Sequence, residues 1–281
     1  MKIKTKKVFS ALLAVLIIAA SLSSCSLSQS SLSFQKNETG YALYRYKNTS
    51  TQTVFTVPDT YENEPVTELM DFSVSNSEYL KEIHIGKNIK EIGIWALTNC
   101  PTLEKIVVDE ENPYFTTADG VLYTKDMTIL LFYPNAKTPL VTDDKGTVTG
   151  GAEFKVPDSV KVIRSNAFYL CANLYTIEFN KGLETIGDKA FLKCGNLTKL
   201  ELSDTVKTIG TDAFSYCDAL AKVDIPASVT KIGDYAFFST ASSIEKIVIH
   251  QKDADALELG SNWIPQKKNS VKEKVEVEYM G

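Results

Sequence analysis

One phrase of 23 residues, written four times in succession, most constrains what this chain can fold into. Its copies begin at Val160, Leu183, Val206 and Val229. Each copy has two aliphatic positions, then an Ala-Phe pair, and then aliphatic residues at alternate positions. Self-similarity at this period predicts a solenoid, in which a unit cannot close its own core and must stack on its neighbours. The function of such a chain depends on the surface of the stack.

Two degraded copies precede these four. Ile89 to Val108 keeps every position of the phrase, with Leu97 in place of the usual Phe. Val66 to Ile85 lies one period earlier and keeps only the aliphatic positions. We therefore predict six repeats, two over residues 66–111 and four over residues 160–250.

Each repeat has two parts with different periodicity. In Gly187–Cys194, Asp188 is placed to accept hydrogen bonds at a helix start, and apolar residues follow at one-turn spacing. In Leu197–Leu202, apolar and polar residues alternate, as in a strand with one buried face. These patterns predict an α/β solenoid in which every unit supplies a short helical turn and one rung of a parallel sheet.

The phrase resembles the repeat of the BspA-type leucine-rich repeat family, which reads roughly I-G-x-x-A-F-x-x-C-x-x-L-x-x-I-x-I-P. The resemblance covers residues 66–111 and 160–249, and Arg164 departs from it by standing where the motif has Gly. It implies a curved solenoid on bacterial cell-surface proteins, which are binding modules or have no known role and are not enzymes. For some members it also implies adhesion to host or matrix protein.

Two positions of the repeat are expected to form columns in the core. The first holds Phe168, Phe191, Phe214 and Phe237, and the second holds Cys171, Cys194 and Cys217, with Cys100 in the same position. The cysteines could form a metal ladder or disulfides. A spacing of 23 matches no common metal-binding pattern, however, and no His lies beside them. We therefore predict free thiols that behave as small apolar core residues.

The N-terminus has the pattern of an export signal. Four lysines before Val8 are followed by an apolar run to Ala20, which is too short to span a bilayer comfortably. Leu22-Ser-Ser-Cys25 then resembles the lipobox of bacterial lipoproteins, which implies that residues 1–24 are removed and that Cys25 is lipidated and anchors the protein to the membrane. An ordinary cleaved signal followed by a coincidental Cys is the alternative.

The segments outside the repeats are expected to connect and to cover them. Residues 25–40 are rich in Ser and predict a tether. Residues 41–65 predict an N-terminal β cap, a hairpin of Tyr41–Tyr46 with Gln52–Val57. Residues 251–281, with Trp263 and an alternating segment up to Tyr279, predict a C-terminal cap.

Residues 112–159 interrupt the period and predict a β-hairpin insert, formed by Gly120–Thr124 and Thr128–Pro134 and followed by an exposed loop. Loops on a rigid scaffold often carry binding, although a hairpin common to the family is the alternative. Asp109–Glu111 and Asp143–Asp144 are candidate Ca²⁺ sites, but neither has the alternating acidic spacing of a calcium loop.

The outward positions of the rungs form a candidate binding face. Lysines and acids stand in two neighbouring columns, so that opposite charges can pair across the columns and the default interpretation is a self-neutralising, solvated face. As a binding surface it would suit a polar protein partner or a glycan. The candidate residues are Glu82, His84, Lys105, Glu178, Lys199, Glu201, Lys222, Asp224 and Lys246.

Composition and motifs argue against two classes of function. The net charge is −5 and becomes more negative without the signal lysines, which disfavours nucleic-acid binding. His84 and His250 are the only histidines, and no common catalytic or phosphate-binding motif is present, so we predict no enzyme and no cofactor or metal. The leading hypothesis is a lipid-anchored protein-binding or adhesion module. A scaffold for neighbouring envelope proteins and a hydrolase with an unrecognised site are the alternatives.

Overall fold

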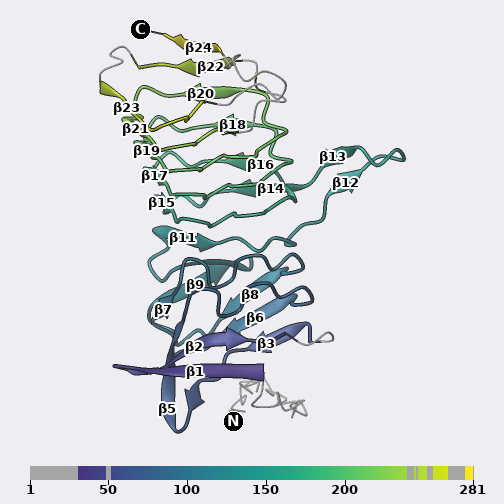
Figure 1. Cartoon of the computed structure of the whole chain (residues 1–281), viewed down its shortest axis with the longest axis vertical. Coiled ribbons are helices and arrows are strands. Elements are labelled where there is room, and N and C mark those ends of the chain that lie inside the picture. The colour runs from purple at the N-terminus through teal and green to yellow at the C-terminus, as the bar shows by residue number, and fades with distance from the viewer. Residues whose placement is uncertain are drawn as a thin grey trace, which may run out of the picture.

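The computed structural model describes residues 31–48, 52–238, 244, 246–251, 256–264 and 276–280, and the chain in these ranges winds into a stack of coils (Figure 1). The predicted signal segment 1–24 and the predicted lipidation site Cys25 lie outside the described residues. Within those ranges no helix is long and apolar enough to cross a membrane.

One side of the stack is built from rungs that pair in parallel. Successive rungs are one repeat apart, as in the pairing of Glu82 with Lys105 and of Leu200 with Val223. Val223 pairs with Ile247, one residue more than the period, because the last repeat contains an extra residue. The rung strands are β3 (Val54–Thr56), β6 (Glu82–Ile85), β8 (Lys105–Val108), β14 (Ala152–Lys155), β16 (Leu174–Glu178), β18 (Leu200–Glu201), β20 (Val223–Ile225), β22 (Lys246–Ile249) and β24 (Glu276–Tyr279).

A second side of the stack carries shorter parallel strands, mostly of two residues. In most coils the aliphatic residue of the strand points into the core and its neighbour points out, as for Ile186 and Thr185. These strands are β2 (Gly40–Tyr46), β5 (Glu64–Leu69), β7 (Glu91–Ile92), β11 (Ile129–Phe132), β15 (Val162–Ile163), β17 (Thr185–Ile186), β19 (Thr208–Ile209), β21 (Lys231–Ile232) and β23 (Glu258–Leu259).

The solenoid is confirmed, but the short helical turns are wrong, because the turn segment Gly187–Cys194 bonds along the stack. The N–H groups of Lys189, Phe191 and Lys193 donate to carbonyls of the next coil at 2.8 to 2.9 Å. The alternate N–H groups donate three residues back, and Lys189 and Lys193 have positive φ of 56° and 64°. A helix needs every N–H for its own segment and negative φ throughout, so none forms.

Asp188 also differs from its predicted role as a helix cap. Its Oδ1 accepts a hydrogen bond of 2.8 Å from the backbone N–H of Thr211, which lies in the next coil. The coils approach so closely here that a Cβ on Gly210 would lie 2.5 Å from the backbone nitrogen of Asp188. The Gly-Asp pair of the motif therefore joins consecutive coils.

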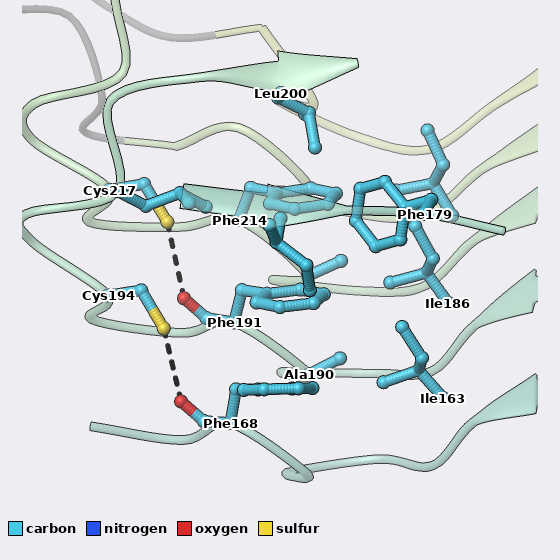
Figure 2. Packing of buried hydrophobic residues seen from close by; sticks show 14 of the residues in the cluster. Ile163, Phe168, Phe179, Ile186, Ala190, Phe191, Cys194, Leu200, Phe214 and Cys217 are labelled. Carbon is cyan, nitrogen blue, oxygen red and sulfur yellow. Dashed lines mark hydrogen bonds between the residues drawn. The ribbon is translucent and has the colours of Figure 1, made fainter. Parts of the chain in front are cut away.

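The aromatic column runs through the centre of the stack (Figure 2). Phe168, Phe191, Phe214 and Phe237 are fully buried, and their ring centroids are 4.7, 5.1 and 5.4 Å apart with nearly parallel planes. Tyr133 extends the column by one ring, 4.9 Å from Phe168. Because Tyr133 lies in the predicted insert, part of that insert forms a coil of its own.

The cysteine column lies beside the rings and is buried and free of disulfides. The thiol of Cys194 donates to the carbonyl of Phe168 at 3.1 Å, and that of Cys217 donates to the carbonyl of Phe191 at 3.2 Å (Figure 2). Burial raises the pKa of Cys171, Cys194 and Cys217 and raises that of Cys100 to about 11. Each thiol therefore occupies an apolar core position and adds a weak hydrogen bond to a backbone carbonyl.

The predicted tether and N-terminal cap are wrong in their details. Residues 32–37 form β1 (Leu32–Asn37), which pairs antiparallel with β2, so the tether cannot extend past Ser31. β2 does not form a hairpin with residues 52–57, since β3 pairs in parallel with the next rung, β6, and β2 pairs with β1 and β5. Residues 41–65 are therefore a degenerate coil, and β1 covers its open edge, with β4 (Thr60–Tyr61) folded against β5.

The predicted insert divides the core into two clusters. β9 (Phe115–Ala118), β10 (Val121–Thr124) and β11 form an antiparallel meander, in which Val121 and Tyr123 face the C-terminal cluster and Leu122 faces the N-terminal one. The exposed loop predicted after the insert hairpin is instead largely a second hairpin, of β12 (Val141–Thr142) and β13 (Val148–Gly150), that projects from the stack (Figure 1).

One side chain joins the two core clusters across the meander. Arg164, in the Gly position of the motif, donates through Nη1 to the carbonyl of Ile92 at 2.9 Å and so links coils on either side of the meander.

At the C-terminus the coil geometry continues past Ile249, where the sequence repeat stops. β23 pairs with β21, and the backbone N–H of Phe237 donates to the carbonyl of the buried Trp263.

The aromatic column yields a prediction about stability. Phe191→Ala should lower the free energy of unfolding by about 3–5 kcal/mol, because it leaves a cavity between two stacked rings. Phe191→Leu should cost less than about 1.5 kcal/mol, since Leu97 already fills this position in another coil. Urea unfolding followed by circular dichroism measures both. Equal midpoints for wild type and Phe191→Ala would contradict the packing described.

The cysteine column yields a prediction about reactivity. In Cys25→Ala protein, a disulfide-exchange reagent at neutral pH should leave the four core thiols unmodified in the native state and modify all four in denaturant. Burial keeps the reagent away from these thiols, and their raised pKa lowers the fraction of thiolate, which is the reactive form. Fewer than four thiols in denaturant would show that disulfides or a bound metal occupy the column.

Candidate functional site: the rung face

The outward side chains of the rung strands form a surface that we call the rung face. It is divided into three sheets that follow one another along the stack, β3-β6-β8, β14-β16 and β18-β20-β22-β24 (Figure 1). The nine predicted residues therefore occupy three separate patches. Glu82, His84 and Lys105 lie on the first, Glu178 on the second and Glu201, Asp224 and Lys246 on the third, with Lys199 just before β18 and Lys222 just before β20.

Charges on the rung face neutralise one another in pairs. Lys199 contacts Glu201 at 2.8 Å and Lys222 contacts Asp224 at 2.6 Å, in each case from positions two apart. Such positions share a face because side chains alternate along a strand. These side chains are between 38 and 72% exposed, so each pair contributes little to stability and remains available for contacts.

Pairs also form between neighbouring rungs. Lys155 contacts Glu178 at 3.0 Å across β14 and β16, and Lys246 contacts Glu278 across β22 and β24. The pairing with Glu178 raises the pKa of Lys155, chiefly through their hydrogen bond. Lys155 and Glu278 were not among the predicted residues, although both stand at outward positions, because the sequence did not reveal β14 as a rung or the register of β24.

The N-terminal patch centres on one carboxylate. Oε1 of Glu82 lies 2.6 Å from Nε2 of His84 and 3.5 Å from Nζ of Lys105. The second histidine, His250, lies at the other end of the stack, 4.0 Å from Asp224. The two imidazoles therefore belong to different patches and cannot act on one substrate.

A groove of about 810 Å³ that the repeat pattern did not predict lies between β16 and β18. It opens where the rung sheet is interrupted, since these two strands share only the bridge between Thr176 and Lys199. Apolar side chains form its floor and charged ones its rim. The lining residues are Glu153, Phe154, Lys155, Thr176, Ile177, Glu178, Phe179, Lys181, Lys199, Glu201, Leu202, Ser203 and Asp204. Phe179, where the other repeats have Leu, Ile or Val, is the one sequence signal at this place.

The acidic pairs considered for Ca²⁺ have structural roles. Oδ1 of Asp143 accepts hydrogen bonds from the N–H groups of Lys145 and Thr147 at 2.9 and 2.8 Å, and Oδ1 of Asp109 accepts one from Glu111 at 2.8 Å. These carboxylates therefore stabilise tight turns. In the part of the chain that the structure describes, no three His, Cys, Asp or Glu side chains gather closely enough to hold a metal ion.

Solved structures of bacterial leucine-rich repeat proteins resemble this stack. The pneumococcal vaccine antigen PcpA has a TM-score of 0.52 at 17% identity, over 83% of this chain and 84% of that one. A leucine-rich cell surface protein from Faecalibacterium prausnitzii has a TM-score of 0.44 at 18% identity, over 89% of this chain and 93% of that one. At these identities the PcpA likeness shows the fold alone. The curated proteins contain no match.

A family model gives the assignment. The model described as the BspA type leucine rich repeat region matches six copies, over residues 41–119 and 150–258. These ranges contain the rungs β3 to β22 and the four phenylalanines of the aromatic column, together with most of the strands on the second side. The chain belongs to the BspA-type leucine-rich repeat family.

Proposed function

We propose that this protein is a non-catalytic, lipid-anchored module at the cell surface that binds another protein through its rung face. The family, whose members are typically scaffolds and not enzymes, supports this proposal. The lipobox-like pattern before Cys25 supports the anchor. The leading role is adhesion to a host or matrix protein, and a glycan is the alternative ligand.

The observation that carries the proposal is the arrangement of charge on the rung face. Lysines and carboxylates stand in alternating pairs on strands whose backbone is fixed by the stack. A rigid surface loses little conformational entropy on binding, and charges of both signs favour a partner with a complementary pattern. Catalysis needs convergent groups in a site that excludes water, and these pairs are spread over many coils and exposed.

A specific observation favours an envelope scaffold as the second candidate. β1 begins at Leu32, so only residues 26–31 separate it from Cys25. A fully extended segment of that length spans at most about 20 Å. A lipid on Cys25 would therefore hold the stack close to the membrane, where neighbouring envelope proteins are the nearest partners.

Membrane anchoring is tested by substitution of the acylated residue. Cys25→Ala should move the protein from the detergent phase to the aqueous phase in detergent partitioning, because it removes the atom that carries the lipid. Ser24→Ala keeps a small residue before Cys25 and serves as the matched control. Equal detergent partitioning of Cys25→Ala and wild type would contradict the anchor.

The binding face is tested by charge reversal. Lys222→Glu should weaken capture of the partner about fivefold or more, because it replaces the lysine of the Lys222–Asp224 pair with a second acid on the rung face. Lys207→Glu is the matched control, since Lys207 forms an exposed pair with Glu184 at 2.7 Å away from the rung strands. Pull-down from matrix proteins and from native envelope extracts measures capture and separates the two candidates. Equal losses for both variants would argue against the rung face.

A further inference from the structure

We propose that the groove between β16 and β18 binds an extended polypeptide segment of the partner, with an apolar side chain of that segment seated on the groove floor. The inference rests on the proposed function and deepens it, because it names one site on the rung face and the chemistry that the site accepts. It is carried by three features of the groove: an opened backbone ladder, an uncovered core position and a rim of mixed charge.

The backbone ladder opens at the groove. After the bridge between Thr176 and Lys199, the strands no longer pair, although β14 with β16 and β20 with β22 pair over several residues. At β8, β22 and β24 the N–H that follows the rung donates to a carbonyl one coil back, as from His250 to Ile225 at 2.9 Å. Within the described residues, Ser203 N–H and Phe179 C=O make no such bond. The groove thus offers a donor and an acceptor, the groups that a peptide main chain matches.

The floor of the groove exposes a core position. Leu202 is partly buried, whereas Ile225 and Ile249, which take the same position in later repeats, are fully buried. Phe154 is also partly buried and lies with Ile177 and Phe179 in the same lining. An apolar side chain that covers Leu202 would remove this surface from water, which is favourable in proportion to the area covered.

The rim carries both signs of charge. The pairs Lys155–Glu178 and Lys199–Glu201 stand at the rung side, and Lys181 and Asp204 stand on the connections that follow the strands. A peptide with an apolar residue between charged residues of opposite sign is complementary to this arrangement. The volume of about 810 Å³ lies within the range of pockets that enclose a ligand.

The aromatic residues of the groove favour a peptide over a glycan. Sugar rings stack on exposed aromatic faces, but the ring of Phe154 packs against Tyr133 and Phe168 at centroid distances of 5.0 and 5.7 Å. Phe179 is buried and meets Phe191 edge to face at 6.0 Å. The floor therefore presents aliphatic surface and ring edges, which suit an apolar side chain.

The test uses a phage-displayed random peptide library panned on the immobilised full chain, followed by affinity measurements on an enriched synthetic peptide. The library should yield an apolar residue flanked by charged ones. Leu202→Lys should weaken its binding at least about tenfold by placing a charge on the floor. Ser203→Pro should also weaken it by removing the N–H. The fold accepts this change, because Pro226 stands at the same position of the next repeat.

Matched measurements make the outcome decisive. Lys207→Glu lies outside the rung face and should leave the affinity for the peptide within about twofold of wild type, whereas Lys222→Glu should still weaken capture of the whole partner. If Leu202→Lys fails to fold, hydrogen exchange on wild type replaces it, and added peptide should slow exchange of the amides of β16 and β18. Failure to enrich such peptides, or equal affinity in wild type and Ser203→Pro, would overturn the inference. Capture of the partner that still depended on Lys222 would then leave the proposed function standing.

Discussion

Backbone hydrogen bonds along the axis of the stack are the interaction on which the rest of this structure depends. In the turn segments of the four C-terminal repeats alternate N–H groups donate to the next coil, and on both sides of the stack short parallel strands are also bonded to their neighbours. A strand of two residues has no independent stability, so the coils hold one another in place. The left-handed residues, the close approach at Gly210 and the Asp188 carboxylate are consequences of this bonding, because each allows or completes a bond between neighbouring coils.

The same bonding explains how the interior and the surface divide their roles. Backbone N–H and C=O groups form hydrogen bonds along the axis of the stack. Inward side chains therefore need only to be apolar and to pack against the equivalent side chains of the coils above and below. The parallel rings of the aromatic column and the thiols that donate to carbonyls one coil back show this matching. Outward side chains are not needed for the backbone bonding or for the packing of the core. The paired charges of the rung face therefore contribute more to solubility and to contacts with partners than to the stability of the fold.

Departures from the repeat coincide with the places where the surface changes. The meander of β9, β10 and β11 divides the core, and Arg164 ties its two sides together through the carbonyl of Ile92. The groove between β16 and β18 lies one coil beyond the projecting hairpin β12-β13, where the ladder is reduced to one bridge. A regular stack has a uniform surface, so a specific site requires an irregularity of this kind.

The sequence by itself determined the solenoid, the period of its coils and the inward position of the Phe and Cys columns, because all three follow from residues repeated at constant spacing. It also determined which charges point outward on the regular rungs. Only the tertiary structure decided that the turn segments are not helical, since the choice between bonding within Gly187–Cys194 and bonding to the next coil depends on the neighbour. It likewise decided that residues 32–65 and Tyr133 join the stack and that the ladder opens beside Leu202. Residues 32–65 and Tyr133 lie in segments whose sequences carry no clear repeat, and the opening beside Leu202 lies between two repeats that look regular in sequence. In both cases the spacing of residues along the chain does not show how completely neighbouring backbones pair.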